Sequence, residues 1–291
     1  MKKINIFCFG FGQVAKNFIK KINTEKFSIN LSVTTREQSK AKQFNEIKYN
    51  NFIFNDEIFD NGLIENLKNS DHILISIPPI NGKDIVIKYF GEVIKECNPK
   101  WITYLSATSV YGDHKGEWVN EESETNPKST SGIGRLEAEK SWITFTANSK
   151  LPFQIFRLSG IYSNQKNILV RLKSGNVNLI NKKNQFFSRI HVEDIANVLF
   201  KSLSNFKTGE IYNISDDKPA SMEEVTLYGV KLLNVDIPKI IEVKDIDSEM
   251  LKSFYKDSKK VSNKKMKSFF DYKLKFPTYV EGLNYIRNNL V

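Results

Sequence analysis

Residues 4–15 read Ile4-Asn5-Ile6-Phe7-Cys8-Phe9-Gly10-Phe11-Gly12-Gln13-Val14-Ala15. The apolar run over residues 4–9 predicts a short strand, and two glycines follow it directly. Further apolar residues recur at helical spacing, at Val14, Ala15, Phe18, Ile19 and Ile22. A strand, a glycine turn and a helix in this order are typical of a βα unit that binds a dinucleotide.

Each small residue of the turn has a physical role in that interpretation. Gly10 permits the tight turn, and Gly12 lets the backbone approach a pyrophosphate. Ala15 takes the third position, where only a small side chain lets the helix pack on the strand. The first turn of the helix offers N–H groups and a positive dipole end to phosphates. The alternative is a tight turn that binds nothing.

The end of the second predicted strand, residues 29–33, bears on the choice of cofactor. Sites for NAD usually place Asp or Glu there to bond the ribose 2′-hydroxyl, whereas NADP sites often carry Arg. This strand ends in Thr34, Thr35 and Arg36, and the first carboxylate, Glu37, comes late. The sequence therefore favours NADP, with NAD as the alternative. Arg36 could also be a solvated charge or stack on the adenine.

Composition restricts the class of protein. The chain has 291 residues and a formal charge of +10, and its lysines are scattered rather than gathered in one stripe. This pattern predicts general attraction for anionic small molecules and argues against a nucleic-acid-binding role. No apolar run reaches the roughly 18 residues of a membrane span. Two cysteines, Cys8 and Cys97, make no disulfide framework, which suggests a reducing cytoplasm.

Strand and helix patterns alternate to about residue 158, which indicates an α/β fold with a doubly wound parallel sheet of Rossmann type. A small C-terminal α/β lobe is expected to follow. The predicted dinucleotide-binding domain spans 1–158 and 186–204, and the predicted substrate-side lobe spans 159–185 and 205–291. Further strands are expected at 51–54, 72–77, 101–106 and 153–158, and helices at 62–69, 84–95, 132–148, 192–204 and 221–233.

Several fragments occur in the order known from one family. They are Leu105–Gly112, Arg135–Glu139, Arg157–Tyr162, His191–Ala196, Gly209–Ile214, Val261–Lys265 and Pro277–Leu283. They resemble the extended short-chain dehydrogenases/reductases, the NAD(P)-dependent epimerase/dehydratase family, in an atypical branch. The resemblance covers nearly the whole chain. It implies a Ser or Thr after the fifth strand, a Tyr acid/base on the next helix, and a Lys four residues later.

This chain departs from the family at all three positions, where it has Ala107, Ser131 and Arg135. A serine hydroxyl cannot replace a phenol as an acid near neutral pH. No tyrosine occurs between Gly112 and Ile161, so the usual acid/base pair is predicted to be missing. The candidate catalytic residues are then Ser131, Arg135, Tyr111 and Thr108.

Ligands of such sheets bind beyond the carboxyl ends of the strands. The residues expected to contact the cofactor are therefore Gly10, Gly12, Gln13, Val14, Ala15, Thr34, Thr35, Arg36, Ile77, Pro78, Ser106 and Arg135. His191, with Glu193 and Asp194, is expected to be structural at a helix N-terminus, with acid/base chemistry as the alternative. No metal-ligand spacing occurs.

Three functions remain open from the sequence. The first is an NADP-dependent oxidoreductase or epimerase-like enzyme with a rearranged acid/base. The second is a non-catalytic NADP-binding redox sensor or regulatory protein, and the third is a scaffold or nucleic-acid binder with a vestigial pocket. The expected partner is a small-molecule substrate, anionic or nucleotide-linked. No nucleic acid and no membrane are expected, and a homodimer is left open.

Overall fold

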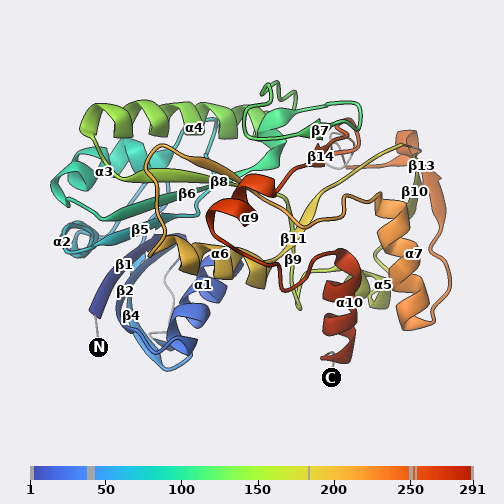
Figure 1. The fold of residues 1–291 in the computed structure, drawn as a ribbon, viewed down its shortest axis with the longest axis horizontal. Coiled ribbons are helices and arrows are strands. Elements are labelled where there is room, and N and C mark those ends of the chain that lie inside the picture. The colour runs from blue at the N-terminus through green and yellow to red at the C-terminus, as the bar shows by residue number, and fades with distance from the viewer. Residues whose placement is uncertain (1–2, 38–42, 183, 249–251, 253, 290–291) are drawn as a thin grey trace. The chain divides into compact units, whose positions relative to one another are not determined.

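The computed structural model describes residues 3–37, 43–182, 184–248, 252 and 254–289 (Figure 1). The chain divides into two compact units. The first consists of Met1–Ala107, Ile133–Arg157 and Ile195–Tyr212. The second consists of Thr108–Gly132, Leu158–Asp194 and Asn213–Val291.

The first unit contains the large sheet and its helices, wholly or for the most part. They are β1 (Lys3–Phe9), α1 (Gln13–Thr24), β2 (Ser28–Thr35), β3 (Gln43–Phe44), β4 (Ile47–Ile53), α2 (Gly62–Lys68), β5 (His72–Ile75), α3 (Ile85–Glu96), β6 (Trp101–Ala107), α4 (Thr130–Ser149), β8 (Phe153–Leu158), α6 (Val192–Ser202) and β12 (Ile211–Ile214).

The eight strands follow the order β12-β8-β6-β5-β1-β2-β4-β3. The pairs β6–β5, β5–β1, β1–β2 and β2–β4 are parallel, and β3 is antiparallel to β4. β1 lies in the middle, and its residues Ile6–Phe9 are buried because helices cover both faces. The order reverses at β1, so the cofactor edge predicted for such sheets is the carboxyl end of β1.

The helices α2, α3 and α4 pack on one face of this sheet (Figure 1). The core there joins Phe7 and Phe9 of β1 to Leu63 of α2, Phe90 of α3 and Trp142 of α4. α1 and α6 lie on the other face. There the ring of Trp101 stacks on Phe18 of α1, and its indole N–H donates to Ser202 Oγ of α6 (3.1 Å). Helices therefore shield both faces of the sheet from solvent, as is typical of a doubly wound parallel sheet.

The second unit is built from shorter elements. They are η1 (Thr108–Tyr111), β7 (Trp118–Val119), β9 (Gly160–Tyr162), α5 (Ile168–Lys173), β10 (Leu179–Asn181), β11 (Arg189–His191), α7 (Met222–Leu233), β13 (Ile240–Glu242), η2 (Val243–Asp245), β14 (Lys260–Val261), α9 (Lys264–Phe269) and α10 (Tyr279–Asn288). The strands pair in parallel as β9–β11, β7–β14 and β10–β13. Apolar side chains of α5, α7 and α10 form the core.

A buried ion pair fixes α4 against β8 in the first unit. Arg157 Nε lies 3.1 Å and 3.2 Å from the two carboxylate oxygens of Glu139, and its terminal nitrogen Nη2 donates to Glu139 Oε2 at 2.8 Å. The side chains of Arg157 and Glu139 are only 5% and 1% exposed. Separating the pair would leave each charge buried without a partner, which is energetically costly. The ion pair therefore favours the one orientation of α4 in which Glu139 meets Arg157.

The predicted fold class is confirmed: the protein is α/β, with a doubly wound parallel sheet. The predicted helices agree closely, and α4 covers the helix expected at 132–148. β4 begins at Ile47, four residues before the strand expected at 51–54, because its first residues pair with β2 through Leu31 and Tyr49.

The two observed units differ from the predicted domain boundaries. Residues 108–132 fall in the second unit, whereas the sequence placed them in the first. The reason is that β7 pairs with β14, which lies in the C-terminal part of the chain. Residues 186–194 also fall in the second unit, because β11 pairs with β9.

Two further findings concern the surroundings of the protein. Within the part of the chain that the structure describes, no helix is both long enough and apolar enough to cross a membrane. Cys8 is buried and Cys97 is half-buried, and both are free thiols. The cytoplasmic location stays a prediction.

We expect Glu139→Gln to lower the free energy of unfolding by about 3 kcal/mol, because it leaves the Arg157 charge buried without its counter-charge. Chemical denaturation measures this. The matched control is Glu137→Gln on the same helix, whose exposed pair with Lys140 should contribute no more than about 0.5 kcal/mol. Equal effects of the two variants would contradict the importance given to the buried pair.

Candidate functional site

The turn after β1 has the geometry that a dinucleotide site requires. Gly10 has φ of +88°, a conformation that side-chain-bearing residues rarely adopt. A Cβ at Gly10 would stand 2.8 Å from Ser76 Oγ, and that hydroxyl donates to the Phe9 carbonyl (2.9 Å). The turn is therefore held against the end of β5, and only glycine fits there.

Gly12 is the N-cap of α1, and its surroundings are open. A Cβ built on it would meet no protein atom within 4 Å. No side chain caps the helix, and no acidic residue stands in its first turn. Gln13 begins the helix, while Val14 and Ala15 are buried beneath it. The free N–H groups and the empty space suit a phosphate group approaching the backbone.

The end of β2 lies directly beside this turn. Thr34 Oγ1 accepts the N–H of Gly10 at 2.8 Å and is buried. Thr35 Oγ1 donates to the backbone oxygen of Glu37 at 2.7 Å. The two hydroxyls therefore shape the turn and the strand end. Arg36 is exposed and is the cation that remains at this position.

The loop after β5 completes the surroundings of the turn. Ile77 is half-buried, and its Cγ1 would be 3.2 Å from a Cβ at Gly10. Pro78 follows and is exposed. Both predicted positions thus follow the carboxyl end of one strand, β5, which neighbours β1, and such sheets bind ligands at that edge.

At the carboxyl end of β6, Ser106 is buried, and its hydroxyl has no hydrogen-bond partner among the residues described. Arg135 on α4 is half-buried, and its terminal nitrogen Nη1 donates to the Leu105 carbonyl at 2.7 Å. It also lies 3.4 Å from the Tyr104 hydroxyl. One N–H of Arg135 is therefore used to attach α4 to β6, and an arginine retains further donors for a ribose.

Ser131, Arg135 and Glu139 succeed one another at four-residue intervals on α4, so they share one face of the helix. Ser131 is exposed in the first turn, and its Oγ lies 3.5 Å from Ser129 Oγ. Thr108, at the start of η1, is half-exposed. No described group in direct contact with Ser131 could serve as its base.

In the second unit, Tyr111 is fully buried, and its hydroxyl donates to Asn213 Oδ1 at 2.8 Å. Glu121 accepts the N–H of Asn213 at 2.7 Å. His114 Nε2 lies 3.2 Å from each of the carbonyl oxygens of Tyr111 and Glu124. These contacts favour packing and loop organisation over proton transfer for Tyr111 and His114.

Other titratable groups are strongly perturbed by burial. Burial raises the pKa of Tyr104 and of Tyr162 well above the usual value for a phenol. Burial lowers the pKa of His191 to about 4, so the ring is neutral at pH 7. His191 Nδ1 accepts the Glu193 N–H, and its ring packs 4.2 Å from Phe276. This geometry supports the structural interpretation of His191.

Comparison with known proteins adds the family. The model of the NAD dependent epimerase/dehydratase family matches residues 89–215. One similar solved structure is that of a conserved protein of unknown function from Silicibacter pomeroyi. Its sequence is 30% identical to this chain, the match covers 98% of each chain, and the TM-score is 0.88. The chain belongs to the NAD-dependent epimerase/dehydratase family.

More distant structures share the fold. One is dTDP-glucose 4,6-dehydratase from Bacillus anthracis in complex with NAD, with 18% identity, coverage of 98% of this chain and 96% of that chain, and a TM-score of 0.78. Another is UDP-glucose 4-epimerase from Thermotoga maritima with UDP-glucose, with 15% identity, coverage of 99% and 100%, and a TM-score of 0.77. No curated protein matches the sequence.

Several residues that organise this epimerase/dehydratase fold were missed by the sequence interpretation. Ser76 holds the glycine turn, and Asn213 receives the Tyr111 hydroxyl. Ser76 directly follows a buried strand, a signal that could have found it. Asn213 gives no such signal, because its partner lies about 100 residues away in sequence. Asp194, which the sequence placed at a helix N-terminus, accepts hydrogen bonds from the Tyr272 hydroxyl and from the N–H groups of Lys275 and Phe276.

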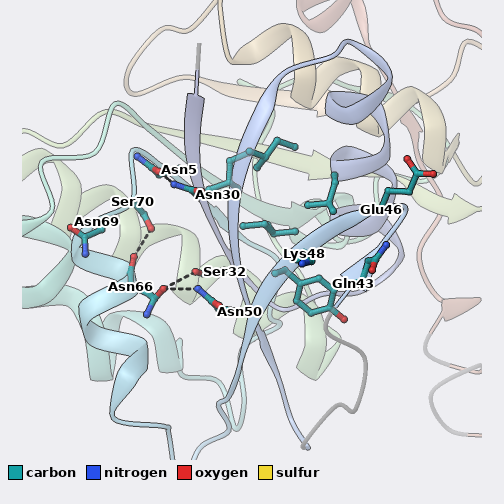
Figure 2. A pocket seen from close by; sticks show the side chains of 15 residues that line it. Asn5, Asn30, Ser32, Gln43, Glu46, Lys48, Asn50, Asn66, Asn69 and Ser70 are labelled. Carbon is teal, nitrogen blue, oxygen red and sulfur yellow. Dashed lines mark hydrogen bonds between the residues drawn. The ribbon is translucent and has the colours of Figure 1, made fainter. Parts of the chain in front are cut away.

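A cavity of about 990 Å³ lies elsewhere, at the amino ends of β1, β2 and β4 (Figure 2). Its polar side chains bond one another: Asn66 Oδ1 accepts from Ser32 Oγ (3.2 Å) and Asn50 Nδ2 (3.0 Å). Asn30 likewise donates to Asn5 Oδ1 at 2.7 Å. This hollow is at the opposite end of the strands from the glycine turn, and it includes none of the predicted site residues.

Gly12→Ala is expected to weaken NADPH binding about tenfold or more, because the added methyl group occupies the space through which a phosphate approaches. Since the position is open and its backbone is extended, stability should change by less than about 1 kcal/mol. The comparison variant Gly10→Ala should instead destabilise the fold, by about 1–3 kcal/mol. Titration with NADPH and thermal denaturation separate the two effects; full affinity in Gly12→Ala would contradict this site.

Proposed function

We propose that this protein binds NADP(H) in preference to NAD(H). Arg36 carries the proposal, because it is exposed at the end of β2, and Thr34, two residues earlier, bonds the glycine turn. No carboxylate precedes it at the strand end, where Asp or Glu would bond a 2′-hydroxyl and repel a 2′-phosphate. A guanidinium offers several donors to a phosphate group.

We further propose that the protein is an oxidoreductase or epimerase-like enzyme with an atypical acid/base. Family membership supports this function, and Gly10, Gly12 and Arg36 would hold the cofactor. When bound, a nicotinamide supplies or accepts a hydride. Arg135 would bond the ribose with the donors not used on Leu105, and Ser106 offers an unpartnered buried hydroxyl beside it.

The proposed substrate is a small anionic or nucleotide-linked molecule. The support comes from the distant relatives, one of which was solved with UDP-glucose, and from the formal charge of +10.

A second function, a non-catalytic NADP-binding sensor, is favoured by one set of contacts. Tyr111, the phenol nearest in sequence to the missing acid, is fully buried and bonded to Asn213. Ser131 and Ala107 supply no acid at neutral pH. A sensor needs a cofactor site but no catalytic acid. A measurement of substrate turnover by this protein therefore distinguishes the two functions.

Arg36→Ala should weaken NADPH binding about tenfold and change NADH binding by less than about twofold, since the two cofactors differ only in the 2′-phosphate. Calorimetric titration of both cofactors measures this. The wild-type protein should bind NADPH more tightly. Equal or reversed affinities in the wild type would remove the proposed preference.

Wild-type turnover of carbonyl substrates should be slow, because general acid–base help is worth roughly 10²–10⁴ in rate. The triple variant Ala107→Ser, Ser131→Tyr, Arg135→Lys should increase NADPH oxidation over a carbonyl and nucleotide-sugar panel. Rapid wild-type turnover that Ser131→Ala abolishes would contradict the missing acid. Cofactor binding without any turnover, in either protein, would favour the sensor.

A further inference from the structure

One face of the large sheet changes from apolar to polar along its strands. It is the face on which α2, α3 and α4 pack, and toward the carboxyl end of β1 it presents Phe9 to the core. Toward the amino ends, strand pairing places Asn5 opposite Asn30 and Ser32 opposite Asn50. Because side chains alternate along a strand, these four polar residues lie on the same face as Phe9. The apolar core therefore does not reach this end of the face.

The polar end of the face is hollow. The cavity of about 990 Å³ lies there, and residues at the C-terminal end of α2 and just after it, Asn66, Asn69 and Ser70, also line it (Figure 2). Sites for small molecules have volumes of roughly 300–1,000 Å³. The hollow is therefore large enough for a small organic molecule.

Hydrogen bonds hold the amide groups of this hollow in place. Asn66 Oδ1 accepts from Ser32 Oγ at 3.2 Å and from Asn50 Nδ2 at 3.0 Å (Figure 2). Asn30 Nδ2 donates to Asn5 Oδ1 at 2.7 Å. The amides of Asn30 and Asn50 are thus oriented before a ligand arrives, which lowers the entropy cost of binding it.

The same two amides keep unused hydrogen-bonding atoms. Among the residues that the structure describes, neither Asn30 Oδ1 nor Asn50 Oδ1 accepts a hydrogen bond. Each amide nitrogen also has a second hydrogen to donate, and both side chains are exposed. A hydroxyl group can donate and accept at once, so it can bond both the oxygen and the nitrogen of an amide.

The lining of the hollow carries little net charge. Of its 15 residues, only Glu46 and Lys48 have charged side chains at neutral pH. Both are exposed, and their charges are opposite. Strong binding of a phosphate or a carboxylate relies on charge-assisted hydrogen bonds from cations. The hollow therefore suits an uncharged ligand better than an anion.

We propose that this hollow is a binding site for a neutral, polyhydroxylated small molecule, a sugar or a polyol, whose hydroxyl groups bond the amides of Asn30 and Asn50. The hollow lies at the amino ends of the strands, whereas the glycine turn lies at a carboxyl end. The inference therefore does not rest on the proposed NADP(H) binding, and it adds a second site to the first unit.

Saturation-transfer NMR measures the binding of glucose, trehalose and myo-inositol to the wild-type protein, with glucose 6-phosphate as the charged comparison. At least one of the neutral compounds should bind with a Kd of about 1 mM or lower. Glucose 6-phosphate should bind no more tightly than glucose. The two sugars and the cyclic polyol show which kind of polyhydroxylated molecule the hollow prefers.

The variants Asn30→Ala and Asn50→Ala should each weaken this binding about threefold to tenfold, because each removes one or two neutral hydrogen bonds to the ligand. The matched control is Asn61→Ala, since Asn61 is exposed at the other end of α2 and its side chain makes no cap hydrogen bond. Lys48→Ala should change the affinity by less than about twofold, because the ligand is uncharged. Thermal denaturation confirms that the variants are folded.

Each other result has a defined meaning. If none of the neutral compounds binds, the inference is wrong and the hollow is a solvated end of the sheet. Binding that both Asn30→Ala and Asn50→Ala leave unchanged would place the ligand elsewhere and would also overturn it. Tighter binding of glucose 6-phosphate that Lys48→Ala removes would identify an anion site instead. A wild-type protein that binds a neutral compound here but neither cofactor would refute the proposed function and support this inference.

Discussion

Arg157 on β8 and Glu139 on α4 are almost fully buried, so neither charge is stable there without the other. Their contact fixes which face of α4 turns toward the sheet. Arg135, one turn earlier on that face, consequently meets the Leu105 carbonyl on β6. The orientation of α4 is thus set by a buried charge pair and by a contact with a backbone carbonyl of the central sheet.

The cofactor edge depends on a second constraint, the close approach of β1, β2 and β5. Ser76 and Thr34 hold the glycine turn from two neighbouring strands. With the turn held in this way, Gly12 is exposed at the start of α1, and Arg36 is exposed at the end of β2. The N–H groups of the first helical turn and this cation suit a phosphate group.

The acid/base pair of this protein remains a prediction. The sheet, the glycine turn and α4 are those of an epimerase/dehydratase, and the resemblance aligns Ser131 and Ala107 with the family's phenol and hydroxyl. The buried phenols do not compensate, because burial raises the pKa of Tyr104 and Tyr162.

Much of this protein was determined by its sequence. Local patterns of apolar residues predicted the glycine turn and the main strands and helices of the large sheet, because the period of a helix or strand is visible in its own residues. The short elements of the second unit gave no such pattern. The lack of a tyrosine between Gly112 and Ile161 is likewise independent of structure. Only the tertiary structure decided which side chains contact each other. Thr34 accepts a hydrogen bond from Gly10, and Tyr111 donates one to Asn213. The ammonium of Lys16 lies near the rings of Phe11 and Phe44. It also moved residues 108–132 into the second unit. These contacts join residues distant in sequence, and no local pattern encodes which of many hydroxyls, rings or charges the folded chain will bring together.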